Sequence, residues 1–229
     1  MLLKRNPKKS QNLPNSSSGL EVSIRGQSLV LLPEKAMYWP EQDVLLISDV
    51  HLGKISHFRK AGIGLPAKAL HDNYKRLQYI IDKCSPSSII FLGDLFHSSY
   101  NNEWMYFKEF REANKNISFQ LIMGNHDILD IDMYSLVNLE ICSHKNLDPF
   151  LLTHHPKQDA ELYNLCGHIH PAIKIRGKGR QSIRMPCFFF SRYQGILPAF
   201  GTFTGSHALK AANDDMVFGI TGDTIIRIQ

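Results

Sequence analysis

The sequence lacks three features that mark particular classes of protein. No apolar run approaches the roughly 18 residues that span a membrane. The basic opening segment, MLLKRNPKKS, is not followed by the apolar segment of a secretion signal. The 4 cysteines include no C-x-x-C pair, so neither a disulfide framework nor a thiolate metal site is indicated. These absences favour a cytoplasmic protein without membrane contact.

Acidic residues are also missing from a long stretch, between Glu161 and Asp214, although the formal charge of the whole chain is only +5. Two interpretations fit the stretch. It could form a surface that binds a polyanion such as nucleic acid, or a solvated β-hairpin whose basic edges prevent pairing with other strands. Charge alone leaves both open. The basic residues concerned are Lys174, Arg176, Lys178, Arg180, Arg184, Arg192 and Lys210.

The order of hydrophobic patterns predicts a basic tail followed by one domain. Residues 1–19 end in NLPNSSSG and show no periodicity, which predicts a disordered tail. Residues 20–229 form the expected domain, in which strands and helices alternate at first and strands then dominate, as in an α/β core with a β-rich extension. The strands are expected within 21–32 (around a Gly26–Gln27 turn) and at 43–49, 87–94, 117–124, 148–155, 160–170, 172–177, 182–190, 216–220 and 224–228. The helices are expected at 66–84 and 102–116.

Side chains of the kinds that bind metals follow five consecutive expected strands. A tight turn would explain any one group, such as GNHD in LIMGNHDILD. However, ligands of α/β sheets gather at the carboxyl ends of strands. Five such groups, mixing carboxylate, imidazole and amide, therefore predict a site for manganese, iron or zinc. The groups are Asp49 and His51; Asp94 and His97; Asn125, His126 and Asp127; His154 and His155; and His168 and His170.

The order D-x-H, G-D-x-x-H, G-N-H-D, a histidine after a strand, and G-H-x-H resembles the calcineurin-like metallophosphoesterase superfamily over residues 43–171. The resemblance implies a four-layer α/β/β/α sandwich of two mixed sheets, with two divalent metals, most often manganese, at one edge. By motif position, the implied ligands of the first metal are Asp49, His51, Asp94 and His170. Those of the second are Asp94, Asn125, His154 and His168, with His155 as the alternative to His154.

The same resemblance implies the chemistry. A hydroxide that bridges the metals would attack phosphorus in line with the leaving oxygen. His126 would act as general acid, and Asp127 would orient its ring. His97 occupies a position at which many relatives have aspartate. The GDLFH motif is also found in the double-strand-break repair nucleases. His97 would either contact substrate phosphate or pack behind the metal ligands.

Segments 31–66 and 184–207 are similar to the ligase-associated phosphoesterases, the PdeM branch of this superfamily. That branch is grouped with a DNA ligase, a helicase and a β-CASP-type nuclease in bacterial DNA repair, which implies a manganese-dependent phosphodiesterase or DNA endonuclease. Lys54, Arg176 and Arg184 then become candidate contacts to phosphate. The alternatives are hydrolysis of a small phosphodiester, a nucleotide or a phosphomonoester, and a scaffold that keeps the fold without metals.

Overall fold

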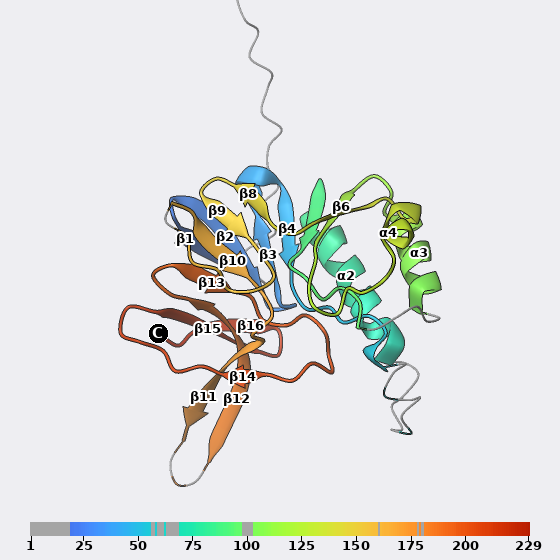
Figure 1. The fold of residues 1–229 in the computed structure, drawn as a ribbon. Coiled ribbons are helices and arrows are strands. Elements are labelled where there is room, and N and C mark those ends of the chain that lie inside the picture. Colours follow the sequence, from blue (N-terminus) through green and yellow to red (C-terminus); the bar gives the residue numbers. More distant parts are fainter. Residues whose placement is uncertain are drawn as a thin grey trace, which may run out of the picture.

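The computed structural model describes residues 19–55, 58, 62, 69–97, 103–159, 161–177, 179 and 181–229. The predicted tail lies outside the described residues, except for Gly19. Two β-sheets lie face to face, and helices cover the outer side of the first sheet (Figure 1). None of the described helices is long and apolar enough to cross a membrane.

The first sheet is mixed and follows chain order from β1 to β7. Its strands are β1 (Leu20–Ile24), β2 (Gln27–Leu32), β3 (Ala36–Trp39), β4 (Val44–Ile47), β5 (Ser88–Phe91), β6 (Ser118–Ile122) and β7 (Leu139–Cys142). Strands β1 to β4 pair antiparallel, and β4 to β7 pair parallel. The parallel half is therefore the half whose carboxyl ends meet at one edge.

Two local features of this sheet differ from the prediction. The first turn lies at Arg25 and Gly26, one residue early, because Gln27 already pairs with Ile24. Both turn residues have positive φ, as the tight turn of a two-residue hairpin requires. Strands β3 and β7 were missed, since four residues each carry too little pattern to be recognised.

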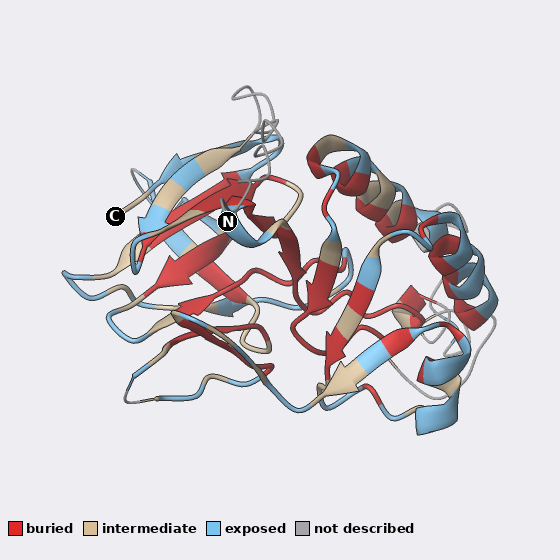
Figure 2. Ribbon diagram, turned by 90° about the horizontal axis from the view of Figure 1, so that it is seen from above, coloured by how far each residue is buried: buried red, intermediate tan, exposed pale blue. Residues whose placement is uncertain are grey.

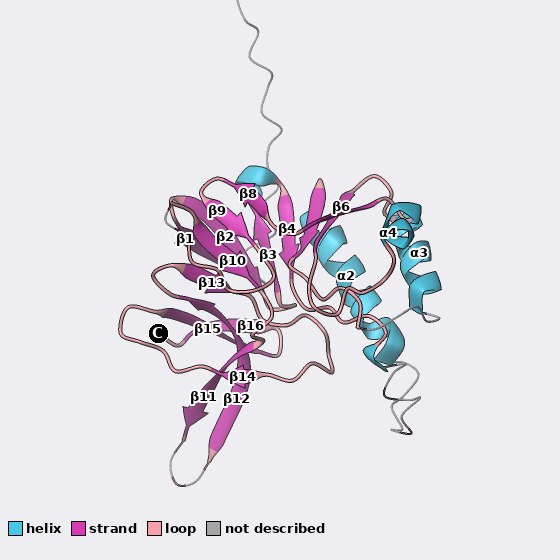
Figure 3. Cartoon of the chain, viewed as in Figure 1, coloured by secondary structure: helices cyan, strands magenta, loops and turns pink. Residues whose placement is uncertain are grey.

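The α-helices of the first half connect the parallel strands, whereas the short η1 connects the antiparallel strands β3 and β4 (Figure 3). They are η1 (Pro40–Gln42), α2 (Ala69–Cys84), α3 (Glu103–Ala113) and α4 (Ile131–Leu136). The apolar face predicted for α2 is buried at Tyr74, Leu77 and Ile81, which pack on the outer side of the first sheet. Burying each such side chain stabilises the fold by about 1.5–3 kcal/mol. Residues 66–68 of the expected helix lie outside the described residues.

The second sheet is also mixed, with the order β14-β11-β12-β13-β10-β9-β8, while β15 pairs with β12 and β16. Its strands are β8 (Lys145–Leu147), β9 (Phe150–Leu152), β10 (Tyr163–Cys166), β11 (Pro171–Arg176), β12 (Ser182–Phe190), β13 (Gln194–Ile196), β14 (His207–Ala208), β15 (Met216–Thr221) and β16 (Thr224–Arg227). Strands β9 and β10 are shorter than predicted, so the histidine groups that follow them lie in loops.

The core between the sheets is apolar and follows the alternation of the strands. Phe188 and Phe190 face the first sheet, whereas Cys187 and Phe189 face the opposite side. Figure 2 shows the buried strands in the interior. The predicted α/β sandwich of two mixed sheets is confirmed. On the outer face of the second sheet, Leu209, Ala211 and Ile228 pack where a helical layer was expected, and the described helices lie on the first sheet's side.

Candidate metal centre

Loops after four strands of the two sheets meet at one edge. In the first sheet, Asp49 N donates to Gly93 O at 3.1 Å and His51 N donates to Asp94 O at 2.9 Å. In the second sheet, Gly167 N donates to His154 O at 3.1 Å. The sheets are joined where His168 N donates to the carboxylate of Asp49, at 3.0 Å to Oδ2. The predicted convergence of the strand ends is therefore present.

The backbone at this edge is strained. Five of the predicted ligands have φ between 51° and 66°: Asp49, His51, Asp94, His168 and His170. A residue other than glycine in this left-handed region costs about 1–3 kcal/mol, and such residues cluster at functional sites. The surrounding hydrogen bonds hold the conformation in place. This backbone conformation directs the ligand side chains of the first and second sheets toward one another.

A first group of ligand atoms comes from Asp49, His51 and His170, all within 4.8 Å of one another. His170 Nε2 lies 3.2 Å from Asp49 Oδ1, and its Nδ1 lies 3.1 Å from Gly205 O. A carbonyl on one imidazole nitrogen leaves the other nitrogen available to a metal. Burial, reinforced by the charge of Lys54, lowers the pKa of His51 to about 2, which keeps its ring in the neutral form that metals require.

The orphaned Nε2 of His51 tests whether these residues fit a metal. This atom is buried and has no hydrogen-bond partner among the described residues, although Asp94 Oδ2 lies 3.8 Å away. A buried polar atom without a partner normally costs about 1–3 kcal/mol. A divalent cation between this nitrogen and the carboxylates would remove that cost. The donor set of imidazole and carboxylate suits manganese, iron or zinc.

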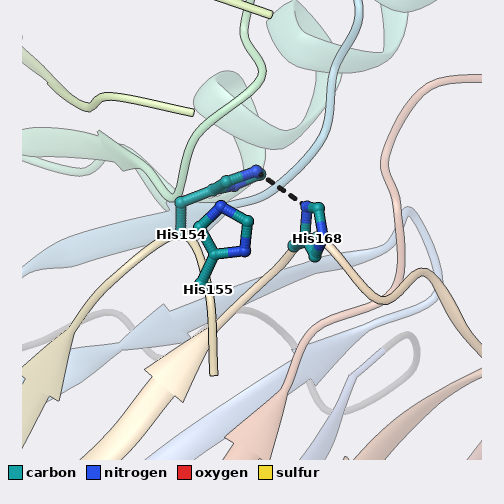
Figure 4. A group of neighbouring side chains, drawn as sticks. All are labelled: His154, His155 and His168. Carbon is teal, nitrogen blue, oxygen red and sulfur yellow. Dashed lines mark hydrogen bonds between the residues drawn. The ribbon is translucent and has the colours of Figure 1, made fainter. Parts of the chain in front are cut away.

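A second group combines His154 with His168 and His155 (Figure 4). His154 Nδ1 lies 2.9 Å from Leu92 O, and its Nε2 lies 3.2 Å from His168 Nδ1 and 3.5 Å from Asp94 Oδ1. Burial, followed by the neighbouring histidines, lowers the pKa of His168. Asp94 therefore presents Oδ1 to the second group and Oδ2 to the first, the position of a bridging ligand.

His154 and His155 differ in their surroundings. His154 is only 2% exposed and faces Asp94, whereas His155 is exposed and its Nε2 lies 2.6 Å from Asn125 Oδ1. The ring of His155 also lies 4.0 Å from that of His168. Asn125 therefore lies next to the second group, as its predicted role requires. His154 and His155 both lie close enough to belong to that group.

His126 and His97 lie side by side above His51. Their rings are stacked, with centroids 4.9 Å apart, and the His126 ring is 5.3 Å from that of His51. His126 is exposed, while its backbone N–H donates to Asp94 Oδ1 at 2.9 Å. His97 Nδ1 lies 3.4 Å from His51 Nδ1, so His97 packs against a predicted ligand and the predicted acid at once.

Asp127 does not take the position predicted for it. Its Oδ1 accepts a hydrogen bond from Phe96 N at 3.0 Å and its Oδ2 accepts one from Gly124 N at 2.9 Å. Burial raises the pKa of this carboxyl to about 6. The side chain therefore clamps two loops together, and the described contacts of its carboxylate do not include the His126 ring.

The predicted phosphate contacts lie at different distances from this edge. Lys54 is close: burial lowers its pKa, and the nearby charges of Asp94 and Asp49 offset part of that shift. Arg184 Nη1 donates to Ser206 O at 3.4 Å, beside the loop that contacts His170. Arg176 is exposed at the far end of β11.

Three supporting residues were missed by the sequence analysis. Asn73 Nδ2 donates to Val50 O, between Asp49 and His51, at 3.2 Å. Asn164 Nδ2 donates to Thr153 Oγ1 at 2.8 Å, just before His154. A buried amide within the apolar YNLC strand was the one available signal. Lys35 lines a notch of about 30 Å³ with His170, and burial, followed by Arg76, lowers its pKa to about 8. Nothing in the sequence around Lys35 marked it.

Comparisons with known proteins agree with this geometry. Residues 43–185 match the family model described as calcineurin-like phosphoesterase. The crystal structure of Pseudomonas putida nuclease MPE superposes with a TM-score of 0.77 at 27% sequence identity, covering 92% of this chain and 100% of that one. Yfce, a phosphoesterase from E. coli, has a TM-score of 0.39 at 14% identity, covering 80% and 90%. No curated protein matches the chain.

Proposed function

The chain belongs to the calcineurin-like phosphoesterase family and is a metal-dependent phosphoesterase, and from this premise we propose that it is a phosphodiesterase that cuts DNA as an endonuclease. We propose further that it holds two divalent ions, most readily manganese, and serves DNA repair in the bacterial cytoplasm alongside a ligase, a helicase and a β-CASP-type nuclease. The observation that carries the proposal is the pair of ligand groups that share Asp94.

The residues divide the work as follows. Asp49, His51, Asp94 and His170 would hold one ion, and Asp94, Asn125, His154 and His168 the other. When bound, such ions polarise the phosphoryl oxygens and lower the pKa of water so that it can attack phosphorus. His126, exposed beside these groups, would bind a phosphate oxygen and give its proton to the leaving oxygen.

Three observations favour a nucleic acid over a small ester. Asn125, His126 and His155 are all exposed, so the edge can receive a substrate that continues in both directions. In addition, the solved structure with a TM-score of 0.77 is a nuclease. The acid-free stretch between Glu161 and Asp214 contains the last predicted ligands, and its basic residues begin at Lys174, shortly after His170, which suits a polyanion.

The direct test uses the purified chain with manganese and two substrates, bis-p-nitrophenyl phosphate and a mixture of linear and circular DNA. Asp94→Ala serves as the blank, since it removes the shared ligand. We expect manganese-dependent cleavage of both substrates, including the circle. Hydrolysis of the ester alone would move the substrate to a small phosphate. Inactivity on both with metals bound would indicate a specialised substrate, and a folded protein that binds no metal would support the scaffold interpretation.

A second variant tests the role of His126. His126→Ala should retain its metals and lose about 10²- to 10⁴-fold in the rate of DNA cleavage. The loss should be much smaller on bis-p-nitrophenyl phosphate, whose leaving group needs little protonation. Equal losses on the two substrates would contradict the general-acid role, and a loss of bound metal would assign His126 to ligand support.

A further inference from the structure

Strand β12 extends beyond its neighbours β13 and β15 in the second sheet. Its residues 187–190 pair with β15, and Phe189 and Phe190 pair with β13 as well. Residues 182–186, by contrast, pair with β11, and β14 reaches only Pro171 and Ala172. Residues 173–176 and 182–185 thus form a two-stranded ribbon, here called the arm. Figure 1 shows the arm extending away from the two sheets.

One face of the arm is basic. Lys174 lies directly opposite Arg184 and Arg176 lies opposite Ser182. Because side chains alternate along a strand, these four residues share one face. The other face carries Ile173, Ile175, Ile183 and Met185. Lys174, Arg176 and Arg184 are all exposed.

This arrangement is unfavourable for the arm alone. Two like charges directly opposite each other destabilise a strand pair, by an amount on the order of 0.2–1 kcal/mol, and a two-stranded ribbon is itself marginal in water. The stretch between Glu161 and Asp214 offers no acidic residue to neutralise the pair. Protection of an open edge would not require cations to face each other across the ribbon. A bound polyanion would offset the repulsion.

The base of the arm is attached to the metal centre. Strand β11 begins at Pro171, directly after the predicted ligand His170. His170 Nδ1 contacts Gly205 O at 3.1 Å, and Arg184 Nη1 donates to the next carbonyl, Ser206 O, at 3.4 Å. The position of the basic face is therefore coupled to that of the ligand. At ~3.3 Å per residue the six residues of β11 extend about 20 Å, about the rise of six base pairs.

We propose that the basic face of the arm binds the phosphodiester backbone of a nucleic acid whose scissile phosphate lies at the metal centre. The inference rests on the proposed function, because it requires a polymeric substrate. The apolar face takes no part in this contact. Arg184 would bind nearest to the cut, Lys174 beside it, and Arg176 farthest along the strand.

The test compares three forms of the full chain with the parent protein. The arm variant is K174Q/R176Q/R184Q. The charge control, K75Q/K108Q/R227Q, removes the same charge from the exposed surface of α2, α3 and β16. The face control is Ile183→Gln, on the opposite side of the arm. Binding of a labelled oligonucleotide is followed by fluorescence anisotropy in chelator, which prevents cleavage, between about 50 and 200 mM salt.

We expect the arm variant to bind at least about tenfold more weakly at low salt. Its plot of log affinity against log salt should be shallower by about two to three, since each lost phosphate contact removes about 0.7–0.9 from the slope. The two controls should keep the parent slope. An arm variant with the parent's slope and affinity would overturn the proposal.

The small ester separates this failure from a failure of the proposed function. Hydrolysis of bis-p-nitrophenyl phosphate with manganese reports whether each form has an intact metal centre. A parent protein that hydrolyses the ester but neither binds nor cuts DNA would refute the nuclease function, and the arm proposal with it. A parent that cuts DNA, with an arm variant that cuts equally well at every salt concentration, would refute the arm alone.

Discussion

At the scale of single residues, the metal centre depends on glycines, which have no side chain, as well as on its ligands. Gly93, Gly124 and Gly167 each lie where an added Cβ would collide with a predicted ligand: His154, Asp94 and Asp49 respectively. Gly93 has a φ of +83° as well. The glycines let the ends of the strands approach one another so closely that carboxylates and imidazoles from different loops meet.

Gly124→Ala should therefore disrupt metal binding. The new methyl group would overlap both the carboxylate and the backbone nitrogen of Asp94, which must shift. We expect the bound metal to be lost and the free energy of unfolding to fall by about 1–3 kcal/mol. Metal analysis after gel filtration and urea unfolding would measure the two effects.

Gly177→Ala provides the matched control, because among the described residues its Cβ would meet nothing closer than Gln181 Cβ at 3.6 Å. It should keep the metal content and stability of the parent. A Gly124→Ala protein with normal metal content would show that Asp94 can move without loss of the site.

At the scale of elements, helix α2 supports the first ligand loop from outside. Asn73 Nδ2 donates to Val50 O at 3.2 Å, and its Oδ1 accepts a hydrogen bond from Thr202 Oγ1 at 3.3 Å. The amide thus connects the helix, the D-x-H loop and the segment after β13. On the other sheet Asn164 acts similarly, contacting Leu151 O and Thr153 Oγ1 ahead of His154.

Asn73→Leu should loosen the D-x-H loop. The carbonyl of Val50 would lose its partner in a buried place, which costs about 1–3 kcal/mol of stability. The affinity for manganese should fall about 10- to 100-fold, the usual effect of losing a group that orients ligands. Calorimetric titration with manganese would measure the affinity.

Lys75→Ala, on the exposed face of the same helix, is the comparison for this variant. It should leave the affinity unchanged. If Asn73→Leu bound manganese as tightly as Lys75→Ala, the hydrogen bond to Val50 would have no part in holding the ligands.

At the scale of the whole molecule, the metal centre joins the two sheets. Asp49, His51 and Asp94 follow strands of the first sheet, whereas His154, His168 and His170 follow strands of the second. A divalent metal held by both sets would stabilise the native packing of one sheet on the other, because the unfolded chain does not bring the ligands together.

Manganese should accordingly raise the unfolding temperature. Metal at about 100 times its dissociation constant stabilises by about 2.7 kcal/mol per site, which corresponds to a shift of about 5–10 °C for a domain of this size. Scanning calorimetry with and without chelator would measure it. Asp94→Ala should show little of the shift, and an equal shift in that variant would place the stabilising metal elsewhere.

The types of the candidate ligands, their order along the chain and the mixed α/β architecture could all be predicted from the sequence. These features are local, since each ligand group follows directly on an apolar strand that pairs or packs in a predictable way. Strand β3 escaped the analysis because its signal was too short. The predicted role of Asp127 was not found for a different reason. Its carboxylate accepts a hydrogen bond from Phe96 N, which is 31 residues away in the chain, and a local pattern does not show such a contact.

The way in which these groups combine depends on the three-dimensional fold. Asp49 and His168 are 119 residues apart in the chain, yet they share a hydrogen bond across the two sheets. The position of Asp94 between both histidine groups, the bracing by Asn73 and Asn164, and the opposition of Lys174 to Arg184 all depend on register and on the packing of distant segments. A shift of one residue in any of these strands would turn the side chains to the other face. The local pattern of one strand does not show which distant segment it pairs with or packs on.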